Sequence, residues 1–355
     1  FTASALTCGF DVETTGALGT DTVTLKALVM GSDLDGLVYT WTLTDQDGTP
    51  TVRSGSDLAT LVIPMPVGSY TVALSVKNGA GGEAAAIRPD AFSVSPSDIY
   101  VAVGGAGKFP YDSYENGATT LATALEAASD GTVIHVNDGW HYLADTLAVS
   151  KDVTFVSENG PDRTFVFGRA QTSGAPVILL NSSNAKFSGF TLTGKDQDGK
   201  QPEQWGALRM TGGVLTNCCV CNHKTVNNQA NGSGCRLEGG TVVDCLFTNN
   251  FTQCSGGAGA RGGAIYQTGA NTLVDRCILA SNKVTNGGVS LGGGIYLNNG
   301  TARNLLVIGN YSINYGGGVA VEASGMVQNC TVVNNTSGTG NGGIWLCALL
   351  VVSIN

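Results

Sequence analysis

The chain has 355 residues, of which 51 are glycine and 13% are charged, and its formal net charge is −9. This length is enough for two domains and a sizeable core. Residues 1–205 carry a charge of −12 and residues 206–355 carry +3, with no basic patch dense enough to bind nucleic acid. No run of 18 apolar residues occurs, so the sequence predicts no membrane span. An acidic composition rich in Gly, Thr and Asn is what we expect of a soluble extracellular protein.

The first 95 residues contain short stretches in which apolar and polar residues alternate, separated by turn signals such as Asp45–Gly48 and Pro66–Gly68. These stretches are predicted strands, at Thr22–Val29, Val38–Leu43, Thr60–Ile63, Tyr70–Val76 and Ala91–Val94. Several short strands at this spacing are typical of an antiparallel β-sandwich. Trp41 is expected in its core, and Tyr70 stands where a tyrosine corner would lie.

The segments Leu37–Trp41 and Val67–Val76 resemble those of PKD domains, which are immunoglobulin-like modules. The resemblance implies a spacer or adhesion module of an extracellular protein. The acidic Phe-Gly-Asp-Gly element that usually follows the tryptophan is replaced by Thr42–Asp45, which leaves the subfamily open. We therefore expect a sandwich over residues 1–96 and a second domain over residues 97–355.

The start of the second domain is expected to combine a strand and a helix. Ile99–Val103 is the predicted strand. Residues Thr119–Ser129 are rich in Ala and Leu and predict a helix, which either Thr119 or Thr120 would cap. Thr132–Val136 is expected to begin the first of a series of coils.

The last 150 residues contain a degenerate repeat. Each copy has a Gly-rich corner that leads into a short alternating strand, and the inward apolar positions recur 27, 30, 30, 24 and 25 residues apart. These positions are Leu208, Cys235, Ile265, Ile295, Val319 and Ile344. Repeats of this length indicate stacked units that bury a core only against their neighbours. No copy contains an apolar stripe of helical period, which excludes an α-solenoid.

A second predicted strand recurs inside each copy, with apolar residues at its first and third positions, as expected when one face points inward. Its first positions are Phe190, Cys218, Cys245, Cys277, Leu305 and Cys330. Five residues after each of these positions, from the second one on, stand His223, Asn250, Asn282, Asn310 and Asn335. We expect these asparagines to adopt the left-handed conformation of a corner and to bond to one another from coil to coil. The pattern predicts a parallel β-helix.

This order of elements, with Val136–His141 and Val153–Val156 in the first coils, resembles the N-terminal end of pectin-lyase-like right-handed β-helix proteins. In that family a short amphipathic helix covers the open end of the stack, and the resemblance gives the helix at residues 119–129 this role. The implied fold class is all-β: an immunoglobulin-like sandwich of PKD type, then a right-handed parallel β-helix with a short capping helix. The resemblance fixes no activity, because the superfamily includes lyases, hydrolases, adhesins and surface proteins.

The ten cysteines leave two interpretations open. Stacked cysteines of the inward column would have Cβ atoms near the coil spacing of about 4.8 Å, wider than the roughly 3.8 Å that a disulfide prefers, which favours buried free thiols. The alternative is a set of disulfides, for which the more exposed candidates are Cys219, Cys221, Cys254 and Cys347. A zinc site between Cys218 and His223 is disfavoured, because alternation turns Cys218 inward and the next two cysteines outward.

The residues directly after the inward positions of the first strand are expected to point outward. They form the column Arg209, Arg236, Tyr266, Tyr296, Ala320 and Trp345. Aromatic rings stack on sugars and guanidinium groups pair with uronate carboxylates, so all but the alanine are candidate ligands for a polysaccharide. The alternative is that these are ordinary strand residues, or that neighbouring loops cover them.

The motifs of known uronate-active enzymes are absent: Asn-x-Asp, Asp-Asp, Gly-His-Gly and Arg-x-Lys of polygalacturonases, and Arg-x-Pro-x-x-Arg of pectate lyases. A glycosidase needs two carboxyl groups at a defined separation. The carboxyl groups of the repeats are Glu238, Asp244, Asp275 and Glu322. The catalytic candidates are Tyr266 as the base of a β-elimination, Arg236 to neutralise the uronate, and Glu238 beside them.

Three Asp-x-Asp-Gly stretches raise the question of calcium, and Asp196 and Asp198 of the third stretch are the candidate ligands. The glutamate expected at position 12 of a calcium loop is missing from all three, so plain turns are favoured and we expect no cofactor. The three histidines do not cluster in sequence, which favours packing or corner roles over catalysis. They are His135, His141 and His223.

The sequence therefore favours a non-enzymatic extracellular surface, adhesion or structural protein, in which a sandwich spacer is joined to a β-helix rod. The alternatives are a polysaccharide-active enzyme, either a uronate lyase or a glycoside hydrolase, and a glycan-binding module, both using the outward column. The final residues, Trp345–Asn355, are apolar and lack a polar capping element. We expect either that the natural chain continues beyond them or that this end associates with another copy into a filament.

Overall fold

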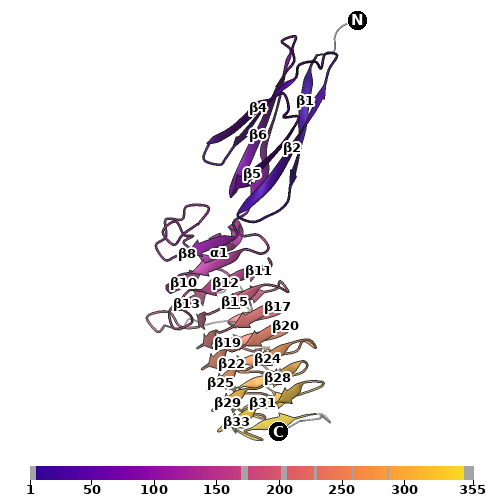
Figure 1. The fold of residues 1–355 in the computed structure, drawn as a ribbon. Helices are drawn as coiled ribbons and strands as arrows, with labels where there is room; N and C mark the ends of the chain where they lie inside the picture. The colour runs from indigo at the N-terminus through magenta and orange to yellow at the C-terminus, as the bar shows by residue number, and fades with distance from the viewer. Residues whose placement is uncertain are drawn as a thin grey trace. The chain divides into compact units, whose positions relative to one another are not determined.

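The computed structural model describes residues 5–168, 175–200, 206–227, 230–257, 259–285 and 288–347. The chain divides into two compact units, residues 1–98 and 99–355. The first unit consists of long antiparallel strands, and the second of short strands stacked in parallel (Figure 1). No helix within the described ranges is long and apolar enough to cross a membrane.

The first unit is the predicted antiparallel sandwich, with one sheet in the order β1–β2–β5 and the other in the order β4–β3–β6–β7. Its strands are β1 Thr7–Thr14, β2 Thr20–Met30, β3 Val38–Thr44, β4 Pro50–Gly55, β5 Thr60–Pro66, β6 Gly68–Lys77 and β7 Glu83–Val94. Burial alternates along β3, β5 and β6, because one face of each strand packs on the core. The sequence missed β1 and β4, since Phe10 is the one buried residue of β1 and β4 has none.

Two aromatic side chains organise this sandwich as predicted. Trp41 is fully buried, its Nε1 donates to the carbonyl of Leu58 at 2.9 Å, and its ring meets Phe10 edge-on. The hydroxyl of Tyr70 donates to the carbonyl of Pro66 at 3.0 Å, which is the bond of a tyrosine corner. Both bonds satisfy polar atoms that would otherwise be buried without partners.

The second unit opens with β8 Asp98–Val101, the helix α1 Leu121–Ala127 and β9 Val133–Val136. Thr120 caps the helix, since its side-chain oxygen accepts a hydrogen bond from the backbone N–H of Thr123 at 3.0 Å. The helix is two residues shorter at each end than predicted, because Thr120 and Ala128 are already extended. Its buried face consists of Leu121, Ala124 and Leu125, which pack into the core of the coils.

Three parallel sheets form the β-helix, and each strand pairs with its counterpart in the next coil (Figure 1). The eight-stranded sheet contains β10 Gly139–Leu143, β13 Thr164–Gly168, β16 Thr191–Thr193, β18 Cys219–Cys221, β21 Leu246–Thr248, β25 Ile278–Ala280, β29 Leu306–Ile308 and β33 Thr331–Val333. The five-stranded sheet contains β19 Lys224–Asn227, β22 Phe251–Cys254, β26 Lys283–Thr285, β30 Tyr311–Ser312 and β34 Thr336–Ser337. The main path of the largest sheet contains β8, β9, β12 Thr154–Ser157, β15 Lys186–Ser188, β17 Leu208–Thr216, β20 Cys235–Val243, β23 Ile265–Gln267, β27 Ile295–Leu297, β31 Val319–Val321 and β35 Ile344–Leu346. Five further strands pair with this sheet off its main path: β11 Leu147–Val149, β14 Ile178–Leu180, β24 Leu273–Asp275, β28 Thr301–Arg303 and β32 Met326–Gln328.

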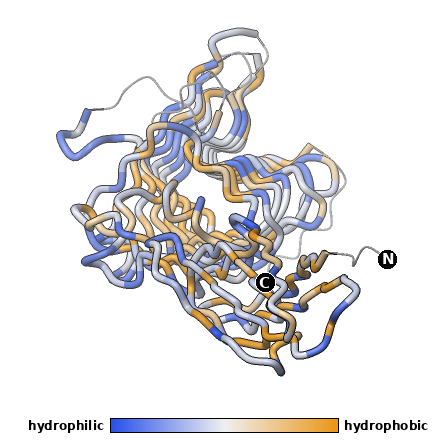
Figure 2. The backbone as a smooth tube through the Cα atoms, turned by 90° about the horizontal axis from the view of Figure 1, so that it is seen from above, coloured by the Kyte–Doolittle hydropathy of each residue, from blue (hydrophilic) through white to orange (hydrophobic). Residues whose placement is uncertain are grey.

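The interior of the coils is a continuous apolar core, and successive coils overlay when the molecule is seen from above (Figure 2). The predicted inward cysteine column is inside it: Cys218, Cys245 and Cys277 are at most 3% exposed, and Cys330 is half-buried. All ten cysteines are free thiols. Cys254, predicted among the exposed ones, is instead buried against Ala260 and Val284, because its strand turns it toward a small second core.

The inward cysteines also have a polar role. Each comes directly after a residue with positive φ, such as Asn217 before Cys218 and Asp244 before Cys245. The thiol donates to the carbonyl two residues back, at 3.1 Å for Cys218 and 3.2 Å for Cys245. A cysteine at this corner therefore packs as a small apolar residue and adds a second hydrogen bond to a carbonyl that already accepts a backbone N–H of the preceding coil.

A ladder of asparagine side chains runs along one corner of the coils, as predicted. The Nδ2 of Asn250 donates to the Oδ1 of Asn282 at 3.0 Å, and the bond repeats from Asn282 to Asn310 and from Asn310 to Asn335 at 2.9 Å. One detail of the prediction was wrong. The left-handed residue is the one before each asparagine, for example Asn249, because the ladder residue itself must turn its amide inward.

The predicted apolar C-terminal end lies mostly in residues 348–355, outside the described residues. In the last described coil, Val332 and Ile344 are only half-buried, although they occupy positions that are fully buried one coil earlier. Association through this end stays a prediction.

Replacing Asn282 with alanine should lower the free energy of unfolding by about 3 kcal/mol. The change removes the acceptor of the Asn250 backbone and side-chain N–H groups and the donor to the carbonyl of Phe247, all buried. Chemical denaturation measures the loss. Asn271→Ala, at an exposed turn, is the control and should change stability little.

The burial of His223 predicts that the folded protein loses stability at acidic pH. It is buried at the first position of the ladder, and burial lowers its pKa to about 4. Because the unfolded histidine binds a proton near pH 6.5, the stability that neutral His223 contributes is present above that pH and should fall by about 3 kcal/mol as the pH drops toward 4. Between pH 7.5 and 4.5, the free energy of unfolding of His223→Asn should change less than that of the parent protein. Equal pH dependence in parent and His223→Asn would contradict the assignment.

Candidate functional site

The predicted outward column is aligned in the structure. Parallel pairing places Arg209 beside Arg236, and Arg236 beside Tyr266, then continues through the remaining members to Trp345. Neighbours in such a column lie about 4.8 Å apart at the backbone, so their side chains must either attract one another or be separated by a partner.

At one end of the column, two arginines share one carboxylate. The Nε of Arg209 donates to Oε2 of Glu238 at 2.9 Å, and the Nε of Arg236 donates to Oε1 at 2.6 Å. The side chains of Arg209 and Arg236 are 46% and 45% exposed, and that of Glu238 is 22% exposed. Glu238 therefore bridges two stacked cations and offsets one of their two charges, and both arginines keep N–H groups facing solvent.

The middle of the column is aromatic. The rings of Tyr266 and Tyr296 stack with centroids 5.2 Å apart, and the guanidinium carbon of Arg236 lies 5.8 Å from the centroid of Tyr266. Tyr296 is only 3% exposed and its hydroxyl donates to the carboxylate of Glu322. Burial, with that bond, raises the pKa of Tyr296 well above its usual range. Tyr296 thus cannot serve as a base near neutral pH.

A second column covers the far end of the first. Isolated parallel bridges align its four members, Asn231, Arg261, Leu291 and Tyr315. Arg261 lies over the ring of Tyr296 at 5.4 Å, Leu291 packs on Tyr296 and Ala320, and Tyr315 stacks on Trp345 at 5.6 Å. Of the alternatives left open, coverage by neighbouring residues applies to Tyr296 and Ala320, which are buried. The two arginines are exposed, while Tyr266 and Trp345 are half-buried.

The sequence does contain a signal for the second column. Each of its members stands directly before a glycine with positive φ: Gly232, Gly262, Gly292 and Gly316. These glycines turn the chain so sharply that the preceding side chain lies across the outward column. The residue directly before each Gly-rich corner therefore identifies the second column.

The other carboxylates of the repeats also have partners. Asp244 accepts from Nε and Nη2 of Arg276 at 2.8 and 2.9 Å, and these bonds lower its pKa. Burial would raise the pKa of Asp275, but hydrogen bonds from Arg303 and Asn304 bring it below the usual value. Asp275 is the last residue of β24, and Asp244 directly follows the last residue of β20. Neither aspartate therefore lies beside Glu238.

The calcium candidates form a turn. The Oδ1 of Asp196 accepts from the backbone N–H groups of Asp198 and Lys200 at 3.1 and 2.8 Å. Asp45 makes the same bonds in the first unit, so the two stretches are equivalent Asp-Gly turns. Within the described residues, no group of three or more His, Cys, Asp or Glu side chains could hold a metal ion.

The histidines are kept apart. His135 stacks on Tyr100, with ring centroids 4.9 Å apart. His141 is buried, its Nε2 lies 2.9 Å from the carbonyl oxygen of Asn137, and burial lowers its pKa. With His223 in the ladder, the three serve packing and corners.

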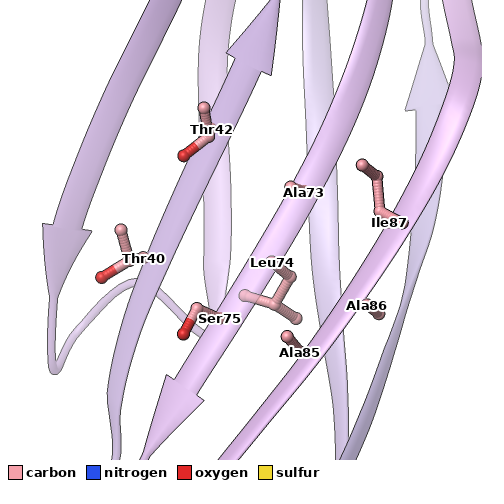
Figure 3. Close-up of a pocket in the computed structure, with 8 residues that line it drawn as sticks. All are labelled: Thr40, Thr42, Ala73, Leu74, Ser75, Ala85, Ala86 and Ile87. Atoms are coloured by element: carbon pink, nitrogen blue, oxygen red, sulfur yellow. The ribbon is translucent and has the colours of Figure 1, made fainter.

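The first unit has a shallow hollow of about 320 Å³ on the outer face of the β3–β6–β7 sheet (Figure 3). Small side chains on β6 and β7 leave the space, and its walls are Thr40, Thr42, Ala73, Leu74, Ser75, Ala85, Ala86 and Ile87. None of these groups is ionisable, so the hollow offers no acid or base.

Comparison with known proteins identifies the family of the first unit. Residues 9–90 match the PKD domain family, and no curated protein matches the chain. Among solved structures, the chain is similar to the pectin methylesterase from Aspergillus niger, with 12% identity, a TM-score of 0.40, and coverage of 74% of this chain and 93% of that one.

Two further structures are similar at lower scores. The catalytic domain of a GH87 α-1,3-glucanase in complex with nigerose has 10% identity, a TM-score of 0.24 and coverage of 98% of both chains. The family 28 exopolygalacturonase of Yersinia enterocolitica has 12% identity, a TM-score of 0.20 and coverage of 96% of this chain and 85% of that one. Similarity at this level says nothing about activity. The chain thus consists of a PKD domain, matched over residues 9–90, followed by a parallel β-helix of about seven turns.

Proposed function

We propose that this chain is a non-enzymatic extracellular protein with a structural or adhesive role, in which the PKD domain is a spacer and the β-helix is a rod. The observation that carries the proposal is the state of the carboxylates of the repeats. Glu238, Asp244 and Asp275 are held by arginines, and Glu322 accepts the hydroxyl of Tyr296. Hydrolysis of a glycoside needs a free pair of carboxyl groups on one face, one of them protonated.

The build of the coils supports a mechanical role. The asparagine ladder and the apolar core continue from coil to coil, so each coil is fixed by its neighbours along the stack. The PKD domain is of a kind typical of extracellular proteins. A rod carried on a small sandwich suits a surface or matrix protein better than an enzyme whose active face must bind and release substrate.

The purified chain should not degrade acidic polysaccharides. Polygalacturonate and alginate are incubated with it, and unsaturated uronates are followed by ultraviolet absorbance and new reducing ends by a colorimetric assay. A pectate lyase is the positive control. Turnover that disappears in Arg236→Ala or in Tyr266→Phe would overturn the proposal and establish the lyase alternative.

The exposed arginine pair favours a second candidate, binding of an acidic glycan without turnover. Arg209 and Arg236 lie side by side, nearly half exposed, next to the stacked ring of Tyr266. A uronate carboxylate can take the N–H groups that Glu238 leaves unused, while a sugar ring packs on the tyrosine.

If this candidate holds, affinity electrophoresis in polygalacturonate gels should retard the chain. The double variant Arg209→Gln/Arg236→Gln should migrate at least several-fold less retarded, because two charge-assisted contacts are lost. Arg53→Gln, an exposed arginine of the PKD domain, is the matched control. Equal retardation of the double variant and the control would remove this candidate.

A further inference from the structure

The outer face of the five-stranded sheet carries a stripe in which lysines alternate with aromatic residues. Parallel pairing places Lys224 beside Phe251, Phe251 beside Lys283, and Lys283 beside Tyr311. In each of these strands the residue that follows the stripe residue is buried. The four residues of this lysine–aromatic stripe therefore point outward, one to a coil, in a row along the axis of the stack.

The ammonium group of Lys283 is held between two rings. Its Nζ lies 5.9 Å from the ring centroid of Phe251 and 5.3 Å from that of Tyr311. Both aromatic residues are half-buried, whereas Lys283 is exposed. The rings therefore fix the ammonium over the sheet while its N–H groups stay open to solvent. A side chain that is already ordered in this way loses less conformational entropy when it binds an anion.

No carboxylate of the same sheet balances the charge of the stripe. None of the residues of β19, β22, β26, β30 and β34 is acidic. None of the ion pairs between described residues involves Lys224 or Lys283. The arginines of the repeats differ in this respect, for example Arg276, which pairs with Asp244 at 2.8 Å. The stripe is therefore a positively charged surface to which an anionic partner can bind.

The spacing of the two lysines indicates what kind of anion fits. Lys224 and Lys283 are two coils apart, which is about 9.6 Å along the axis. The phosphates of a duplex strand follow one another every ~3.4 Å, much more densely than the lysines. An extended polysaccharide advances by nearly one coil spacing for each sugar. Every second sugar of such a chain would therefore face a lysine, and the sugars between would face the aromatic rings.

We propose that the lysine–aromatic stripe binds an extended acidic polysaccharide with one carboxylate per disaccharide, lying along the axis of the coils. The acidic sugars pair with Lys224 and Lys283, and the uncharged sugar between them packs against Phe251. The proposal does not depend on Arg209 and Arg236, which lie on strands of a different sheet. It extends the adhesive role by giving it a class of ligand, and its failure would leave the test for turnover unaffected.

The test is affinity electrophoresis of the full chain in gels that contain hyaluronan, a polymer in which a uronate alternates with an uncharged sugar. The gel should retard the parent chain, and Lys224→Gln/Lys283→Gln should reduce the retardation at least several-fold with unchanged thermal unfolding. The matched control is Lys26→Gln/Lys186→Gln, which removes the same charge from exposed lysines elsewhere and should keep the retardation. Tyr311→Phe should also keep it, because the ring beside Lys283 remains.

Calorimetric titration with short fragments separates spacing from charge. Hyaluronan fragments should bind at least several-fold more tightly than galacturonate fragments that carry the same number of carboxylates on adjacent sugars. Equal affinities would contradict the alternation, and equal retardation of the two double lysine variants would make net charge alone the cause of binding. Single-stranded DNA that binds more tightly than hyaluronan, through the same two lysines, would assign the stripe to nucleic acid instead.

Discussion

The β-helix depends on the register of its coils. Backbone hydrogen bonds between parallel strands place each residue beside its equivalent in the next coil, about 4.8 Å away. A residue type that recurs at the same position of successive coils therefore lies beside a copy of itself. For asparagine the result is a ladder of complementary amides, and for arginine it is repulsion, which Glu238 relieves by accepting from Arg209 and Arg236 together. The ion pairs of Glu238 with these two arginines are a consequence of this register.

The features that repeat were predictable from the sequence. The inward columns, the asparagine ladder and the tyrosine corner each depend on a residue type at a fixed interval or next to a fixed turn, and the structure has all three. The features that the sequence did not reveal depend on the direction that the backbone takes at a single corner. The burial of Tyr296 results from the path of the chain before Gly292, which lays Leu291 across it, and alternation within a strand carries no information on that path.

Alternation also separates the cysteines by chemistry. Cys218 and Cys219 are neighbours in sequence, yet the first is a core residue whose thiol donates to a corner carbonyl, and the second faces outward on the same strand as Cys221. A count of cysteines or their spacing does not distinguish these roles. The parity of each position within its strand does, because it decides whether a thiol meets the core or the solvent. Parity could be read from the sequence.

The asparagine ladder has a direction, and this makes the two ends of the rod unequal. The N–H and Nδ2 of each asparagine donate to the amide oxygen of the next coil, so each coil holds two buried donors that only its successor satisfies. A coil lost on the N-terminal side removes the carbonyl to which the Nδ2 group also donates, as Asn282 does to Phe247, and so strands one buried donor. His223 begins the series without an amide. A coil lost on the C-terminal side would strand two buried donors. Evolution can therefore shorten or exchange this rod more easily at its start than at its far end.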